Sequence, residues 1–284
     1  MALLSQVKDS RAYNITTDPN ASSLVLAMPF NKESGLRDVS HLIRGTGTEF
    51  TNIIRQRYDN GDIIGHESCF YDSCLRCPYT PYQGVLEMNT PQLTGTTALG
   101  TQSFTVEFWV KFDTFDFEAQ FDVMYPPYID TVDPIDDVPY IVLTGDTWPT
   151  VGERRGLQVR RGTGIANSTV ITNINNSFTV GTWYHVAVTR SGSTFYIGIG
   201  TKNSQGSGVT IDGIASNENI GARGIIVNSG SSDHIFTGYN YIFFSRTFNK
   251  GRMPIGVYLQ DFRYYIGVAK YTTTYRVPEP IFTY

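Results

Sequence analysis

Apolar and polar residues alternate with a period of two in several short segments of this chain. In residues 104–112, FTVEFWVKF, the series Phe, Val, Phe, Val, Phe is interleaved with Thr, Glu, Trp and Lys. A period of two predicts a half-buried β-strand. The segment 24–30, LVLAMPF, alternates in the same way. Segments 183–190 and 195–199 flank a short turn containing Gly192, which predicts a β-hairpin.

Other strand patterns recur along the chain, and helical periodicity is nearly absent. Gly, Asn, Ser, Asp and Pro residues separate the segments, as expected for turns. Many short strands with such separators predict an all-β sandwich or barrel. The further predicted strands are 85–88, 140–143, 156–161, 168–174, 224–228, 240–244 and 257–265.

Three stretches do not follow a strand pattern. Residues 1–21 form an N-terminal arm before the main domain, 22–284. Because residues 1–20 have no apolar face, we expect them to be ordered only against a neighbouring subunit. Residues 31–84 are expected to be a long connection, and residues 113–137 a long acidic loop with eight carboxylates and no Lys or Arg. Loops of that length are usually functional or mobile.

Composition narrows the classes of function. The 284 residues carry a formal net charge of −4, and only 17% of them are charged. The chain therefore has too little positive charge to bind nucleic acid by bulk electrostatics. The sequence contains no run of 18 apolar residues, so we predict no membrane-spanning segment. The N-terminus MALLSQVKDSR does not follow the pattern of a secretory signal, so we expect synthesis in the cytoplasm.

The strand sequences resemble a known family. FTVEFWVKF, TWYHVAVTRSGSTFYIGI and VYLQDFRYYIGVAKYTTTYRVPEP, in this order, are similar to laminin-G-like, concanavalin-A-like jelly-roll domains, and the opening LVLAMPFNKESGLRDVS fits the same family. The phrase TWYHVAVTR with a downstream DFR and GVAKYT resembles the subgroup common in bacteriophage virion proteins. The resemblance implies an antiparallel two-sheet jelly-roll sandwich, a location in the virion, and Tyr271 and Pro278 near the end of the domain.

Catalytic patterns are not apparent. Jelly-roll glucanases carry an E-x-D-x-E run that directs acids into one cleft, and this sequence has no such run. Glu107 and Asp261 each stand alone on a predicted strand, and we interpret both as residues of a solvated face. The sequence has no G-x-S-x-G, P-loop or H-E-x-x-H motif. We therefore predict that the protein is not an enzyme.

A cysteine cluster offers a candidate metal site. His66, Cys69, Cys74 and Cys77 read H-x2-C-x4-C-x2-C. Four such ligands could surround a structural zinc ion that pins the long connection. Two alternatives are free thiols buried as small apolar groups, and one disulfide with the third cysteine left over.

The acidic loop offers a second candidate site. Its Asp133, Asp136 and Asp137 could supply oxygen ligands to calcium, and they could equally form a solvated loop or a polar contact with a neighbouring subunit. Tyr125 and Tyr128 of the same loop are candidates for contact with a glycan or a protein partner, because tyrosine offers a flat apolar face and a polar tip.

These observations predict a non-enzymatic bacteriophage virion structural protein, either a capsid decoration or a component of the tail or fibre. It would contact other virion proteins and assemble as a homo-oligomer, for which we expect a trimer. The alternative is a lectin-like module that recognises a host surface glycan. A third interpretation, a glycoside hydrolase, would need two carboxylates facing each other across a cleft.

Overall fold

The structure is a computed structural model of the 284-residue chain. It describes residues 14–49, 53–55, 62–65, 70–71, 73–77, 86–89, 103–113, 120–125, 139–144, 156–161, 169–174, 178–192, 194–201, 215–219, 240–246, 257–273, 275 and 277–283.

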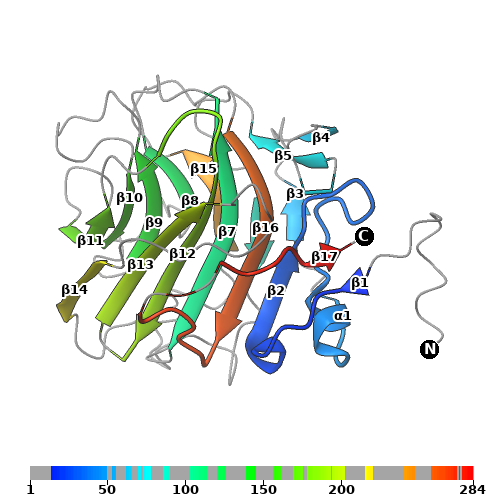
Figure 1. Cartoon of the computed structure of the whole chain (residues 1–284), viewed down its shortest axis with the longest axis horizontal. Helices are drawn as coiled ribbons and strands as arrows, with labels where there is room; N and C mark the ends of the chain where they lie inside the picture. The colour runs from blue at the N-terminus through cyan, green and yellow to red at the C-terminus, as the bar shows by residue number, and fades with distance from the viewer. Residues whose placement is uncertain are drawn as a thin grey trace.

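Two antiparallel sheets face each other (Figure 1). In order across the first sheet lie β14 (Ala215–Asn219), β13 (Thr194–Thr201), β12 (Trp183–Ser191), β7 (Phe104–Phe112), β16 (Val257–Ile266), β5 (Ser73–Cys77) and β4 (Asp62–Gly65), while β2 (Leu24–Met28) also pairs with β16. The second sheet contains β11 (Thr169–Ile174), β10 (Leu157–Arg161), β9 (Pro139–Thr144), β8 (Gln120–Tyr125), β15 (Asn240–Arg246), β6 (Leu86–Asn89) and β3 (Ile53–Arg55). The predicted all-β jelly-roll class is confirmed.

The predicted hairpin is present with regular register. Strand β12 pairs with β13 from Tyr184 opposite Thr201 to Ser191 opposite Thr194. Gly192 in the turn has a φ of 58°, a left-handed conformation that glycine adopts without steric cost. The predicted strand at 104–112 coincides with β7. The strand predicted at 224–228 lies outside the described residues.

The two long irregular stretches contain more regular structure than predicted. The expected connection 31–84 includes the helix α1 (Ser40–Arg44) and the strands β3, β4 and β5. The expected acidic loop 113–137 includes β8, so Tyr125 ends a strand. Irregular structure was therefore the wrong prediction at these positions. The segments are short and two of them are sheet-edge strands, so they carry little periodic signal.

The space between the sheets is filled by the apolar alternate residues of β7 and its neighbours. Phe108 of β7 stacks on Phe262 of β16 with ring centroids 6.3 Å apart. Phe104 packs edge-on against Phe195 of β13 at 5.8 Å. Burying each such side chain contributes about 1.5–3 kcal/mol. Fully buried members include Phe104, Val106, Phe108, Val110, Val186, Val188, Phe195, Ile197, Leu259 and Tyr264.

The opposite face of the same sheet is also buried. All nine residues of β7 and all ten of β16 are buried, including the Thr, Glu and Lys positions that alternate with the core. The described residues of segment 267–283, called the tail below, run across this face (Figure 1). The tail begins where Gly267 N donates to Ser103 O at 2.7 Å. The prediction that these strands are half-buried is therefore wrong, because β7 and β16 are buried on both faces.

Residues 14–20, called the arm below, dock on their own chain. Strand β1 (Asn14–Ile15) pairs antiparallel with β17 (Phe282–Thr283) at the end of the tail. Thr16 N donates to Ile281 O at 2.9 Å, and Thr16 Oγ1 donates to Pro280 O at 2.6 Å. The expectation that the arm needs a neighbouring subunit is wrong for these residues, because backbone hydrogen bonds hold them without an apolar face. Residues 1–13 lie outside the described residues.

Candidate functional site

The register of the central strands sets polar residues side by side beneath the tail. Glu107 of β7 lies opposite Ala187 of β12 on one side and Arg263 of β16 on the other. In the next row, Trp109 lies between His185 and Gln260. Because alternate residues of paired strands share a face, this arrangement follows from the alternation in the sequence.

Glu107 is the centre of a buried hydrogen-bond network, and its side chain is 1% exposed. Its carboxylate accepts hydrogen bonds from the Tyr271 hydroxyl and from Lys270 Nζ at 2.8 Å. The Tyr265 hydroxyl lies 3.1 Å from Oε1 and shares its single proton between Glu107 and Asp18 Oδ2, which is 2.6 Å away. Arg263 Nη1 lies 3.6 Å from Oε1. Burial by itself raises the pKa of Glu107, but Lys270, His185 and Arg263 outweigh it and hold that pKa well below 4.5. The interpretation of Glu107 as a solvated residue is wrong, since the tail covers its face.

His185 joins the same network to the tail. Its Nδ1 lies 3.1 Å from the Tyr275 hydroxyl, and its Nε2 lies 3.7 Å from Glu107 Oε2. The Tyr275 ring stacks on Tyr271 with centroids 3.8 Å apart. Burial lowers the pKa of His185 although Glu107 opposes the shift. The imidazole is therefore neutral at neutral pH and acts as a packing and hydrogen-bonding group.

Asp261 sits at an irregularity of β16. Its φ is 50°, and the register with β7 shifts between Gln260 and Arg263. On the other edge, β16 pairs with β5 before this residue and with β2 after it. Asp261 accepts hydrogen bonds from the Tyr71 hydroxyl at 2.6 Å and from Ile281 N at 2.9 Å. It is 1% exposed, and burial raises its pKa, so the prediction of a solvated Asp261 is also wrong.

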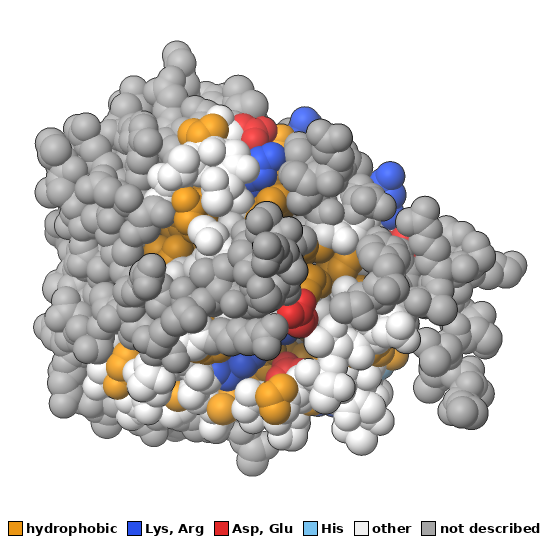
Figure 2. Space-filling view, viewed as in Figure 1, with side chains coloured by type: hydrophobic (Ala, Val, Ile, Leu, Met, Phe, Trp, Pro, Cys, Tyr) orange, Lys and Arg blue, Asp and Glu red, His pale blue; other side chains and the backbone are white. Residues whose placement is uncertain are grey.

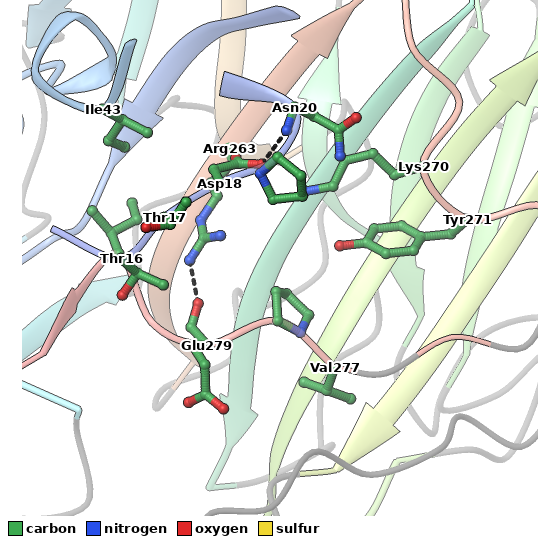
Figure 3. Close-up of a pocket in the computed structure, with 13 residues that line it drawn as sticks. Thr16, Thr17, Asp18, Asn20, Ile43, Arg263, Lys270, Tyr271, Val277 and Glu279 are labelled. Carbon is green, nitrogen blue, oxygen red and sulfur yellow. Dashed lines mark hydrogen bonds between the residues drawn. The ribbon is translucent and has the colours of Figure 1, made fainter. Parts of the chain in front are cut away.

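A pocket of about 630 Å³ opens between the arm and the tail, above this network (Figure 3). We call it the clasp pocket. Residues from the arm form one wall, residues from the tail form another, and Arg263, Lys270 and Tyr271 come from β16 and the start of the tail. The lining residues are Thr16, Thr17, Asp18, Pro19, Asn20, Ile43, Arg263, Lys270, Tyr271, Val277, Pro278, Glu279 and Ile281.

The charged groups of the clasp pocket are held by specific contacts. Arg263 Nη2 donates to the backbone oxygen of Glu279 at 2.6 Å, so the guanidinium supports the tail wall. Lys270 Nζ lies 3.9 Å above the centre of the Tyr265 ring. On the arm wall, Asp18 Oδ2 accepts a hydrogen bond from the Tyr265 hydroxyl at 2.6 Å. The pocket therefore exists only while both terminal segments are docked.

Sequence reasoning did not identify the clasp pocket. Asp18 and Asn20 lie about 240 to 250 positions before Arg263 and Lys270 in the chain, and the two pairs fall in segments interpreted as an arm and as a strand end. Asp18-Pro19-Asn20 does carry a local turn signal. Nothing in the sequence shows that this turn meets the tail.

The structure describes only some of the residues that were predicted to form metal or contact sites. Cys74 is buried on β5 and disulfide-bonded, which is one of the three alternatives for the cysteine cluster. A sulfur in a disulfide is not a thiolate, so the intact bond removes Cys74 from a zinc site. Cys77 and Tyr125 lie on described strands, but their side chains are outside the description. His66, Cys69, Tyr128, Asp133, Asp136 and Asp137 lie outside the described residues.

The described part of the chain shows neither a metal-binding cluster nor a membrane-spanning helix. No three His, Cys, Asp or Glu side chains are grouped there so as to hold a metal ion. None of the helices in those same residues has the length and hydropathy needed to cross a membrane. The calcium site stays a prediction, because its three aspartates lie outside the described residues. The predicted four-ligand zinc site conflicts with the disulfide bond of Cys74.

No family model matches the chain, and no curated protein matches it significantly. Among solved structures it is similar to the binding domain of botulinum neurotoxin DC in complex with rat synaptotagmin II, with 9% identity, a TM-score of 0.49, and coverage of 87% of this chain and 48% of that one. It is also similar to a structure from work on botulinum neurotoxin type C, whose cell entry depends on two ganglioside molecules. That match has 10% identity, a TM-score of 0.48, and coverage of 87% of this chain and 48% of that one. The chain spans about half the length of these matched chains.

Proposed function

We propose that this chain is a non-enzymatic, lectin-like recognition module that binds a glycan in the clasp pocket. The observation that carries the proposal is the pocket itself. Its volume of about 630 Å³ lies inside the range of ordinary ligand sites, roughly 300–1,000 Å³. Hydroxyl, amide, carboxylate and guanidinium groups line it together with Ile43, Val277 and Pro278. A sugar presents the same mixture, with hydroxyl edges and apolar C–H faces.

The two buried carboxylates beneath the pocket, Glu107 and Asp261, are not free to act as catalytic groups. Glu107 accepts hydrogen bonds from Tyr271 and Lys270 and shares the Tyr265 proton with Asp18, and Asp261 accepts two hydrogen bonds. Both side chains are 1% exposed. A glycosidase needs one carboxylic acid that reaches the glycosidic oxygen and a second carboxylate that reaches the sugar or a water. Glu107 and Asp261 instead use their oxygens to hold the tail in place.

The described side chains on the viewed face of the molecule are of mixed character. Figure 2 shows apolar, basic and acidic side chains interspersed among the described residues of the viewed face. A large charged partner would be attracted by a field of one sign. A small, hydroxyl-rich ligand needs only local hydrogen-bond partners.

The test is binding of the purified full-length chain to a glycan array, compared with the variant Pro278→Trp. A tryptophan at this wall position is expected to fill the pocket from the tail side, and neither Glu107 nor Asp261 lines the pocket. We expect wild-type binding that the variant loses. Binding to no glycan of any class contradicts the proposal, as does full binding by a folded Pro278→Trp protein.

The finer role stays a proposal that rests on the family resemblance. We propose that the module belongs to a bacteriophage virion, where it would recognise a host surface glycan and assemble with other virion proteins as a homo-oligomer, expected to be a trimer. Electron microscopy of a particle that contains the chain, with its position and copy number, tests this role independently of the glycan assay.

A further inference from the structure

The charged residues of the clasp pocket carry both signs. Arg263 and Lys270 supply two positive groups, and Asp18 and Glu279 supply two negative groups. A ligand with a net charge of either sign would approach two groups of like charge. In a partly enclosed site such contacts are screened less than in bulk water. An uncharged ligand avoids this cost.

The two positive groups are also compensated from below. Lys270 Nζ donates to Glu107 at 2.8 Å, and Arg263 Nη2 lies 3.5 Å from Asp261 Oδ2. Neither Glu107 nor Asp261 lines the pocket. An anionic group in the pocket would have to compete with these buried carboxylates for the same cations. The geometry therefore disfavours acidic sugars and phosphate.

Asn20 is available for a ligand. It occupies the N-cap position of the short 3-10 helix Ala21–Ser23, where a side chain such as asparagine usually caps the helix, yet it makes no side-chain cap hydrogen bond. Within the described residues its side-chain amide makes no hydrogen bond, whereas its backbone N donates to Asp18 Oδ1 at 2.8 Å. The amide lines the pocket with one acceptor and two donors.

Asp18 is held rigidly beside it. The turn that includes Pro19 is closed by Ala21 N donating to Asp18 O at 3.0 Å, and the Tyr265 hydroxyl donates to Asp18 Oδ2. Each carboxylate oxygen has two lone pairs, so each can accept one more hydrogen bond. The arm wall therefore presents fixed acceptors next to an amide that donates, and little conformational entropy remains to be lost on binding.

We propose that the clasp pocket selects an uncharged saccharide, with Asp18 and Asn20 as the specificity-determining pair. Asp18 accepts from one ligand hydroxyl while the Asn20 amide donates to its neighbour. Adjacent hydroxyls on a sugar ring match two such groups on one turn. This inference rests on the proposed function, because it names the ligand class of the same pocket.

In the experiment, the full-length protein is titrated separately with the methyl glycosides of uncharged hexoses, of glucuronic acid, of N-acetylneuraminic acid and of glucosamine. Binding is measured by calorimetry or NMR. The variants are Asn20→Ala and, as the matched control, Thr179→Ala, an exposed residue outside the pocket. Because the Asn20 side chain caps nothing, Asn20→Ala is expected to fold with wild-type stability.

We expect at least one uncharged hexose to bind, with affinity about tenfold lower in Asn20→Ala, the factor given by loss of one ordinary hydrogen bond. Thr179→Ala should bind as wild type. Preference for an acidic sugar or for glucosamine, or unchanged binding by Asn20→Ala, overturns this inference and leaves the proposed glycan-binding function standing. Binding of no sugar in either this panel or the glycan array overturns both.

Discussion

The ring of Tyr275 occupies the space that a side chain at Gly198 would fill. A β-carbon at Gly198 would lie 2.6 Å from the Tyr275 hydroxyl and 2.5 Å from Cε1. The ring cannot simply move aside, because it stacks on Tyr271 and its hydroxyl meets His185. The missing side chain of Gly198 on β13 thus leaves the space, called the socket below, in which the Tyr275 ring packs and holds the middle of the tail in place.

Gly198→Ala is expected to destabilise the protein by about 1–3 kcal/mol, the usual cost of forcing extra volume into a packed site. Urea unfolding measures the change. In a Tyr275→Ala background the same substitution should cost much less, because the socket is then empty. Equal costs in the two backgrounds would show that Gly198 and Tyr275 do not interact energetically.

Glu107→Gln is expected to cost about 3–5 kcal/mol, because it leaves Lys270 and Arg263 buried without their shared carboxylate. The matched control is Glu49→Gln, which breaks the ion pair of Glu49 with Arg37, whose side chain is 70% exposed. That change should cost less than about 1 kcal/mol. Similar costs for both variants, measured by chemical denaturation, would contradict the assigned role of Glu107.

Stability should fall as the pH drops below about 6.5, in part because of His185. Burial lowers the pKa of His185 below its usual 6.5, so the unfolded chain binds a proton that the folded chain excludes. This contribution is fully present above the unfolded pKa and is lost as the pH falls toward the folded pKa. Melting temperatures at pH values between about 7.5 and 5.5 should decline less steeply in His185→Gln than in wild type.

The control for the pH series is His41→Gln, a histidine substitution on α1. If His41→Gln flattens the curve and His185→Gln does not, the buried imidazole is not the group responsible.

Two N-terminal deletions should differ in stability. Removing residues 1–20 takes away β1, the Thr16 hydrogen bonds and the Asp18 contact with Tyr265. Removing residues 1–13 retains all of them. We expect the longer deletion to melt at a lower temperature than the shorter one and to lose glycan binding, because one wall of the clasp pocket is gone. Equal melting temperatures would mean that the arm adds nothing to folding.

Tyr71→Phe tests the junction at Asp261. The Tyr71 hydroxyl donates to Asp261 Oδ1 at 2.6 Å and accepts from Phe282 N at 3.1 Å, so one atom links β16 to the end of the tail. Its loss removes both of these hydrogen bonds at a buried position, at a cost of about 1–3 kcal/mol. Hydrogen exchange of the Phe282 amide should also become faster. An unchanged exchange rate would show that the hydroxyl does not hold β17.

The alternation in residues 104–112 and 183–190 was sufficient to place β7, β12 and the β12–β13 hairpin, since a strand buried on one face has a period of two. The same alternation led to the wrong prediction that Glu107 and Asp261 are exposed to solvent. Alternation distinguishes the two faces of a strand, but it does not show what covers the second face. A polar row under a tail and a polar row under water look the same in sequence.

The sequence by itself determined the all-β class, the central strands and their core-facing residues, because these depend on local periodicity and on side-chain chemistry. Only the tertiary structure decided that the tail covers the outer face, that the arm docks on the tail, and that Asp18 meets Arg263 and Lys270 in one pocket. Those contacts join residues about 250 positions apart. Their formation depends on strand order and on complementary shape, such as the space left by Gly198, which no local pattern encodes.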